Sequence, residues 1–281
     1  MSGQMYVAAT PIGNLSDVSH RLLEVLEMAD TVLAEDTRVT GRLLQHLGVR
    51  AQLTSVHEHN EAGQVDRVLQ QLKAGATLVL VSDAGTPLIS DPGFRLVRAA
   101  READYAVIPV PGPSAVAAAL SVSGLATDAF TFRGFPSAKS SERKRQYRTW
   151  GNEAPTQVVF ESSHRISASL KDAAAVLGDE RPAFLAREMT KAFEQYRAGT
   201  LSSLAAEVAA GDIPAKGEFV LLIAGAPAAQ APDQARVAEV VATLRAELPA
   251  SQAARLASRI TGAPKRVCYD LAIAADPESA T

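Results

Sequence analysis

The sequence predicts an α/β protein with two α/β halves and a small helical tail. Short apolar segments alternate with helical patterns in the first third, a second series of apolar segments follows, and an alanine- and proline-rich stretch precedes further helical patterns. Such strand–helix alternation is typical of a mostly parallel sheet covered by helices. With 281 residues, 47% of them apolar, the chain can bury more than one core. The expected domains are 1–112, 113–226 and 227–281.

Five strands and the helices between them are expected in the first half. A helical pattern over 20–29 follows Ser19, a residue type that commonly caps helices, and another over 65–73 ends before Gly75. Helical patterns also fill the other intervals. The expected strands are 5–9, 31–34, 52–56, 77–81 and 106–110.

The second half begins with an expected helix over 116–123 and continues with another set of strands. Residues 224–235 are rich in alanine and proline and carry little charge, which is typical of a linker. Helical patterns over 237–248, 251–260 and 261–272 then predict a small helical domain. The expected strands of this half are 130–134, 157–161, 183–187, 195–198 and 219–224.

Composition and charge exclude several classes of protein. The net charge of −3 shows that the molecule is no polycation, so nucleic-acid binding would need a local basic patch. The single cysteine, Cys268, excludes an internal disulfide and cysteine-rich zinc sites, which fits a cytoplasmic protein. The longest apolar stretch, 219–229, is too short to cross a bilayer, and no export signal is visible.

Four loops rich in glycine, proline and aspartate follow short apolar segments, at 9–17, 34–44, 79–93 and 109–115. Open α/β sheets bind ligands outside the ends of their strands, so the loops predict one small-molecule site. The alternative is that glycine and proline only form turns. Because GxGxxG and P-loop motifs are absent, these loops would hold the ligand differently. The expected lining residues are Pro11, Asp83, Ala84, Gly85, Ile89, Ser114 and Ala115.

Acidic and imidazole side chains cluster after the second and third expected strands. His57 and His59 would share one face of a strand, as metal ligands do, but no spacing specifies a third ligand, so no metal is predicted. Substrate contact or a solvated strand end are the other interpretations. Asp36 and Arg38 could form a structural ion pair at the start of the next helix.

A basic run covers residues 139–148, with five basic side chains and one acidic one, and Trp150 follows it. One interpretation is a phosphate-binding surface on which Tyr147 or Trp150 stacks against bases. The other is an ordinary solvated helix face. The sequence leaves both open.

Three further polar segments, 160–165, 186–191 and 216–218, flank expected strands of the second half. They would face the same end of a sheet if the strands were parallel.

A series of motifs covers residues 5–225, in the order TPIGNLSD, EDTRVTGRLL, HEHNE, VSDAGTPLISDPG, PGPSA, ESSHR, REMTK and KGEFVL. With these motifs, the chain closely resembles the family of 2′-O-ribose methyltransferases of small-subunit ribosomal RNA, in the tetrapyrrole methylase superfamily. The helical tail is also similar to that family's small C-terminal domain. The resemblance implies a cleft between two α/β domains that binds S-adenosylmethionine, in a homodimer. It further implies methylation of a decoding-centre cytidine in the 16S ribosomal RNA of the 30S subunit.

The resemblance implies that the cofactor lies at the loops already named and at Phe160 and Glu218. It does not single out a catalytic base, for which Glu35, Asp36, His57 and Lys191 are candidates. Arg133 departs from the family pattern, in which an acidic residue is expected. The predicted RNA-binding residues are Arg38, Lys139, Arg143, Lys144, Arg145 and Arg165.

Three other functions remain compatible with the sequence: methylation of a tetrapyrrole or other small molecule, RNA binding by a ribosome-assembly factor without catalysis, and metal-dependent hydrolysis. The basic run and helical tail favour RNA over a small substrate. On this interpretation, replacing Arg143 and Arg145 with glutamate weakens RNA binding and leaves cofactor affinity intact.

Overall fold

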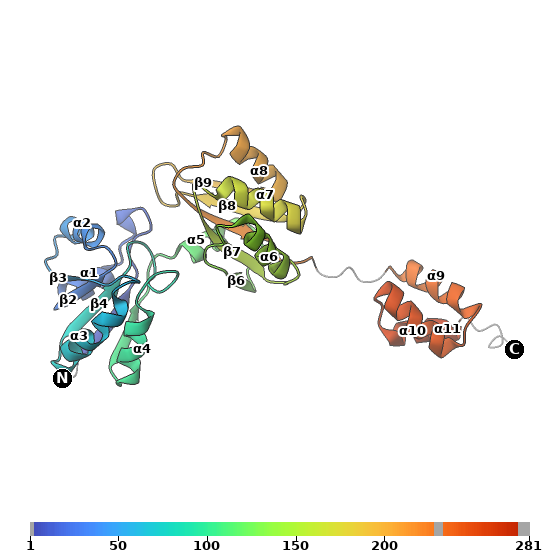
Figure 1. The fold of residues 1–281 in the computed structure, drawn as a ribbon, viewed down its shortest axis with the longest axis horizontal. Coiled ribbons are helices and arrows are strands. Elements are labelled where there is room, and N and C mark those ends of the chain that lie inside the picture. Colours follow the sequence, from blue (N-terminus) through green and yellow to red (C-terminus); the bar gives the residue numbers. More distant parts are fainter. Residues whose placement is uncertain (1–2, 228–232, 275–281) are drawn as a thin grey trace. The chain divides into compact units, whose positions relative to one another are not determined.

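The computed structural model describes residues 3–227 and 233–274, so the expected linker at 224–235 lies partly outside the described residues. The chain divides into two compact units, Met1–Ala226 and Pro227–Thr281 (Figure 1). The first unit contains two five-stranded sheets, and the second contains helices.

The first sheet is entirely parallel, and its strands follow the order β3-β2-β4-β1-β5. All five strands expected from the sequence are confirmed, with ends that differ by at most one residue. The strands are β1 (Gln4–Ala8), β2 (Thr31–Ala34), β3 (Gln52–Ser55), β4 (Thr77–Val81) and β5 (Ala106–Val110). The helices are α1 (His20–Glu27), α2 (Thr37–Leu47), α3 (Glu61–Lys73) and α4 (Phe94–Glu102), with a 3₁₀ turn at η1 (Leu15–Asp17).

Each face of this sheet packs into its own hydrophobic core. On β2, Val32 packs with Leu22 and Leu26 of α1, whereas its neighbour Leu33 packs with Leu72 of α3. Neighbouring strand residues point to opposite faces, so an unbroken apolar strand fills both cores.

The second sheet is mixed rather than parallel, with the order β6-β7-β10-β8-β9. Among hydrogen-bonded neighbours, only β6 and β7 are parallel, whereas β10 is antiparallel to both β7 and β8, and β9 is antiparallel to β8. Glu218 at the start of β10 therefore pairs with Ser162 at the end of β7, and Phe219 pairs with Arg187 at the end of β8. Because β10 is antiparallel to β7 and β8, its start lies beside their ends, and the three polar segments meet at one end of the sheet. The parallel arrangement considered from the sequence is not the one observed. The strands are β6 (Phe130–Phe132), β7 (Thr156–Ser162), β8 (Pro182–Arg187), β9 (Gln195–Thr200) and β10 (Glu218–Ile223).

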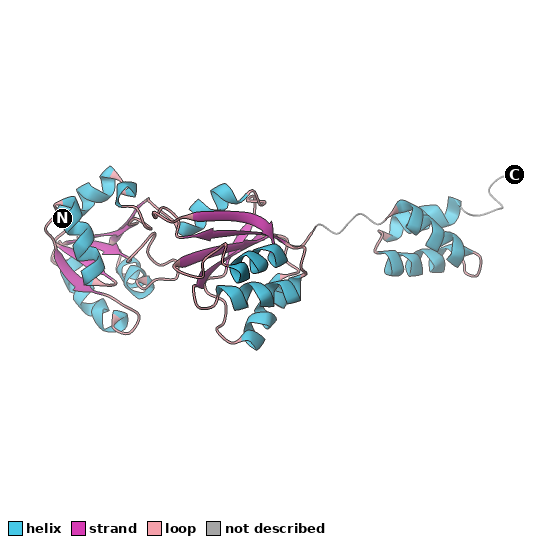
Figure 2. Ribbon diagram, turned by 90° about the horizontal axis from the view of Figure 1, so that it is seen from above, coloured by secondary structure: helices cyan, strands magenta, loops and turns pink. Residues whose placement is uncertain are grey.

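Helices cover both faces of the second sheet (Figure 2). The helix α5 shares one core with β7, β8 and β10, and the helices α6, α7 and α8 share the core on the opposite face. Ile12, in the loop after β1, also belongs to the α5 core, so a first-half loop is anchored on the second half. The helices are α5 (Ala115–Ser123), α6 (Ser140–Trp150), α7 (Ile166–Leu177) and α8 (Leu201–Ala210).

The second unit is a three-helix domain of α9 (Gln234–Arg245), α10 (Ala250–Thr261) and α11 (Lys265–Ala274). The expected helical tail is thus confirmed. The last helix begins at 265 rather than 261, because Gly262 takes a left-handed conformation with φ of 72° that ends α10, and Pro264 follows. None of the helices in the described ranges combines the length and apolar character that a bilayer crossing needs.

Candidate active site

A cavity of about 390 Å³ lies where loops of the two α/β halves meet. Its first-half wall comes from the loops after β1, β4 and β5, and its second-half wall from the ends of β7 and β8 and the start of β10. Seven of the nine residues predicted to bind a cofactor line it: Ala84, Gly85, Ile89, Ser114, Ala115, Phe160 and Glu218.

The other two predicted residues, Pro11 and Asp83, do not line the cavity. Pro11 is buried next to Thr10, whose backbone exchanges two hydrogen bonds of 2.9 and 3.0 Å with Gly85. The Asp83 carboxylate accepts a hydrogen bond of 2.9 Å from the backbone N–H of Asp36. The Thr10–Gly85 and Asp36–Asp83 hydrogen bonds therefore join the loops after β1 and β2 to the loop after β4.

Strained backbone is concentrated in two loops that reach this cavity. Leu88 and Ser90 have φ values of 71°, and Glu188 and Thr190 have φ values of 50° and 65°. Non-glycine residues rarely adopt this region, and such strain persists where the surrounding structure holds it, commonly at functional sites.

Three carboxylates are gathered beside the first-half wall. Burial raises the pKa of Glu35 and of Asp83, and the backbone N–H that each accepts only partly offsets the rise. Burial also raises the pKa of Asp91 to about 6, and the negative charges of Glu35 and Asp83 add to this effect. Sequence reasoning missed Asp91, although it lies in the motif that carried the strongest signal, because burial depends on distant contacts.

Asp36 is poorly suited to accept a proton. Its carboxylate bonds to the Arg38 side chain, with 2.6 Å between Nη2 and Oδ2, and accepts the Arg38 backbone N–H at the start of α2. The side-chain bond from Arg38 is the main reason that the pKa of Asp36 falls to about 2. The structural ion pair considered from the sequence is thus confirmed. It also occupies the guanidinium group of Arg38, one of the predicted RNA-binding residues.

Lys191 is also engaged, because its Nζ lies 2.8 Å from Glu188 and 2.9 Å from Glu218. Burial would lower the pKa of Lys191, but the two carboxylates raise it overall, so the amine stays protonated. The loop after β1 packs closely here: a Cβ on Gly13 would lie 2.5 Å from Lys191 Cγ.

The remaining candidate, His57, lies outside the cavity wall, in the turn before α3. Its backbone N–H donates to Asn60 Oδ1 at 2.8 Å, and its ring centroid is 6.1 Å from that of His59. No group of three or more potential metal-ligating side chains is gathered in residues 3–227 and 233–274.

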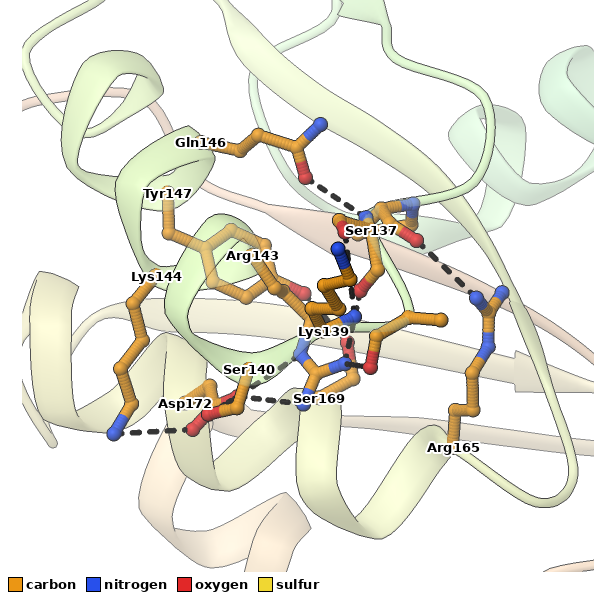
Figure 3. Close-up of polar contacts among 12 residues, drawn as sticks. Ser137, Lys139, Ser140, Arg143, Lys144, Gln146, Tyr147, Arg165, Ser169 and Asp172 are labelled. Atoms are coloured by element: carbon orange, nitrogen blue, oxygen red, sulfur yellow. Dashed lines mark hydrogen bonds and ion pairs between the residues drawn. The ribbon is translucent and has the colours of Figure 1, made fainter.

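Most of the basic run lies on α6, and the structure corrects the expected placement of two of its residues, Arg143 and Tyr147 (Figure 3). Arg143 is buried: it donates from Nε and Nη2 to Asp172 Oδ2 at 3.0 and 2.6 Å and from Nη1 to the carbonyls of Ser137 and Ala138. The expectation that Arg143 presents its charge to RNA is therefore wrong.

Tyr147 and Trp150 are buried as well, so they are not available for base stacking. Lys139, Arg145 and Arg148 are exposed, whereas Lys144 lies 3.3 Å from Asp172. The basic surface of α6 is thus smaller than the sequence suggested.

Arg165, the last predicted RNA contact, is held inside the second half. Its Nε lies 2.8 Å from Glu161 Oε1, and its Nη1 donates to the carbonyl of Pro136. Glu161 lines the cavity, and its other oxygen, Oε2, is buried without a hydrogen-bond partner among the described residues.

Two family models match the chain. The Tetrapyrrole (Corrin/Porphyrin) Methylases model matches residues 4–205, and the RsmI C-terminal HTH domain model matches residues 231–276. The uroporphyrin-III-C-methyltransferase structure from Thermus thermophilus has a TM-score of 0.54 and 21% identity, and the match covers 78% of this chain and 94% of that one. This likeness shows the fold.

Full-length relatives are more specific. The chain is 47% identical to ribosomal RNA small subunit methyltransferase I of Xylella fastidiosa strain Temecula1, over 95% of this chain and 98% of the relative. It is 45% identical to the protein of that name in Escherichia coli O157:H7, over 96% and 95% of the two chains, and 45% identical to that in Pseudomonas aeruginosa, over 97% of both. The resemblance seen in the motifs is confirmed, and the chain belongs to the ribosomal RNA small subunit methyltransferase I family of the tetrapyrrole methylases.

Proposed function

We propose that the protein transfers a methyl group from S-adenosylmethionine to a ribose 2′-hydroxyl of 16S ribosomal RNA, at a decoding-centre cytidine of the 30S subunit. The observation that carries this proposal is the near full-length identity of 45–47% to relatives named as small subunit methyltransferases. A cytoplasmic homodimer, as the resemblance implies, is part of the proposal. The domain boundaries at 112 and 226 also remain predictions.

The cavity has features suited to S-adenosylmethionine. Ala84, Gly85, Ser114 and Ala115 form a wall of small side chains, which lets a ligand approach the backbone closely. The neighbouring carboxylates favour a cation, and the cofactor supplies a methyl group on positively charged sulfur when bound. The unpartnered oxygen of Glu161 supports a ligand that donates a hydrogen bond.

The residues of this chain would contribute in two ways. The cavity between the halves would orient the ribose hydroxyl and the methyl group, and such alignment can offset about 7–11 kcal/mol of a barrier. A neighbouring base would then remove the hydroxyl proton, since a neutral hydroxyl is a weak nucleophile.

The exposed face of α6 is proposed to contact RNA phosphates through Arg145 and Arg148, three residues apart. Replacing both with glutamate is expected to weaken binding to 30S subunits about 10-fold and to reduce the salt dependence, because phosphate contacts release counterions. Filter binding at several salt concentrations measures both effects. The matched control replaces Arg21 and Arg67, exposed on α1 and α3, with glutamate. Equal weakening by both pairs would show a net-charge effect rather than a contact surface.

The function itself is tested by transfer of labelled methyl groups from S-adenosylmethionine to purified 30S subunits lacking this modification. Free 16S RNA and tetrapyrrole precursors serve as parallel acceptors. Label on a ribose 2′-oxygen of the 30S subunit is the expected result, and nuclease digestion followed by mass spectrometry identifies the nucleotide. Label on the tetrapyrrole alone, or none despite cofactor binding, would contradict the proposal.

A further inference from the structure

We propose that Asp91 is the base that accepts the proton of the ribose 2′-hydroxyl during methyl transfer. This inference rests on the proposed function. As the bond forms between the 2′-oxygen and the methyl carbon, the carbon–sulfur bond breaks and its electron pair stays on sulfur, which becomes a neutral thioether. The hydroxyl proton passes to the Asp91 carboxylate and from there to solvent, so atoms and charges balance.

Asp91 differs from the other carboxylates on the cavity wall, which belong to Glu161 and Glu218. Glu161 Oε1 lies 2.8 Å from Arg165 Nε, and Glu218 Oε2 lies 2.9 Å from Lys191 Nζ. No lysine, arginine or histidine of the described residues lies within ion-pair distance of Asp91. It is the lining carboxylate whose proton affinity no cation suppresses.

The loop that carries Asp91 is held in a defined shape. Leu88 and Ser90 precede Asp91 in left-handed conformations, and Gly93 follows with φ of 120° and begins α4. A Cβ on Gly93 would lie 2.6 Å from Leu80 on β4, so the loop packs directly against the sheet. A base held on a fixed loop loses less entropy when it engages the substrate.

The surroundings adjust the proton affinity of Asp91 toward neutral pH. Burial raises its pKa to about 6, the charges of Glu35 after β2 and Asp83 after β4 support the rise, and a hydrogen bond with Ser82 opposes it. From the second half, Glu161 faces the same cavity. A base with this pKa is mostly deprotonated at pH 7 yet binds a proton better than an ordinary aspartate.

The base candidates from the sequence fit this role less well. Asp36, with a pKa of about 2, has low proton affinity, and Lys191 stays protonated between two carboxylates. The Glu35 carboxylate accepts a hydrogen bond of 3.4 Å from the backbone of Asp83 and does not line the cavity. Glu35 instead acts on Asp91 through its charge.

The test is Asp91→Asn, which keeps the shape of the side chain and removes the base. With saturating S-adenosylmethionine and 30S subunits, the single-turnover rate is expected to fall about 10²–10³-fold, while the dissociation constant of the cofactor changes less than about threefold. The wild-type rate should rise about tenfold per pH unit below about pH 6 and level off above it, whereas the variant's residual rate should not show this dependence. Asp104→Asn, at an exposed turn after α4, is the control.

The outcomes separate the two proposals. A wild-type protein that methylates no ribosomal RNA contradicts both. A wild type that is active beside an equally active Asp91→Asn, or a loss of rate that cofactor affinity explains entirely, overturns the role of Asp91 alone. Thermal unfolding checks the fold, and Asp91→Ser, a smaller neutral replacement with the same expected rate and pH profile, covers the case in which the asparagine variant is unstable.

Discussion

Replacing Arg143 with methionine is expected to lower the free energy of unfolding by about 3–5 kcal/mol, the usual cost of removing one partner from a buried ion pair. The side chains of Arg143 and Asp172 are only 3% and 10% exposed. Methionine keeps much of the apolar length, but the carbonyls of Ser137 and Ala138 lose their donor and Asp172 loses two hydrogen bonds. Denaturant unfolding of wild type and variant measures the difference.

The effect of Arg143→Met should depend on pH. Burial alone would raise the pKa of Asp172, but hydrogen bonds from Ser140, Arg143 and Lys144 hold it below its ordinary value of 3.8. A carboxyl with a depressed pKa adds stability above its unfolded-state pKa, and this stability is lost as the pH falls through the folded-state pKa. The cost of the substitution should therefore be largest near neutral pH and shrink below about pH 4.

Two further variants make this prediction specific. Asp172→Asn added to Arg143→Met should recover part of the lost stability, because it removes a buried charge that the first substitution leaves with only Lys144, at 3.3 Å, and Ser140 as partners. Arg98→Met breaks a solvent-exposed pair with Glu102 on α4 and should change stability little. If Arg143→Met were as mild as Arg98→Met, the buried network would not stabilise the fold.

The α6 segment shows what the sequence could and could not predict. Arg143, Tyr147 and Trp150 are spaced four and three residues apart, so they share one helix face, and two aromatic residues on that face were a signal of burial. The partner of Arg143, Asp172, lies 29 residues later on α7, and no local pattern connects them. Charge counting alone therefore overestimated the RNA-binding surface.

The strand directions of the second sheet could be predicted from the sequence only in part. The segment between β8 and β9 spans only residues 188–194, too short for a parallel crossover, and so indicates an antiparallel pair. The position of β10 between β7 and β8 depends on long-range pairing that no local sequence specifies. In contrast, the first sheet was predicted closely, because its apolar segments alternate with helices at βαβ spacing.

The cavity wall was predicted better than its chemistry. Glycine and proline after strands mark loops locally, and five of the seven residues predicted from these loops line the cavity. The proton affinity of Asp91 instead depends on its burial and on the charges of Glu35 and Asp83, which the folded chain brings near it.

Gly85→Ala is expected to raise the dissociation constant of S-adenosylmethionine about 30-fold, or about 2 kcal/mol. Gly85 has φ of 80° and lines the cavity. A Cβ there would lie 3.2 Å from Ile12 Cγ2, so Ile12, another lining residue, would have to shift. The methyl group would also occupy space where a ligand can approach the backbone. Isothermal titration calorimetry measures the affinity.

The matched control is Gly48→Ala, because Gly48 ends α2 with a similar φ of 72° and a Cβ there would meet nothing within 4 Å. Each alanine should cost about 1–2 kcal/mol of stability, since both positions force an L-residue into a left-handed conformation. Only Gly85→Ala should also weaken cofactor binding. Equal losses of stability with unchanged affinity in both variants would show that Gly85 serves the turn alone, and the wall formed by the loops after β1 and β4 would then lie away from the cofactor.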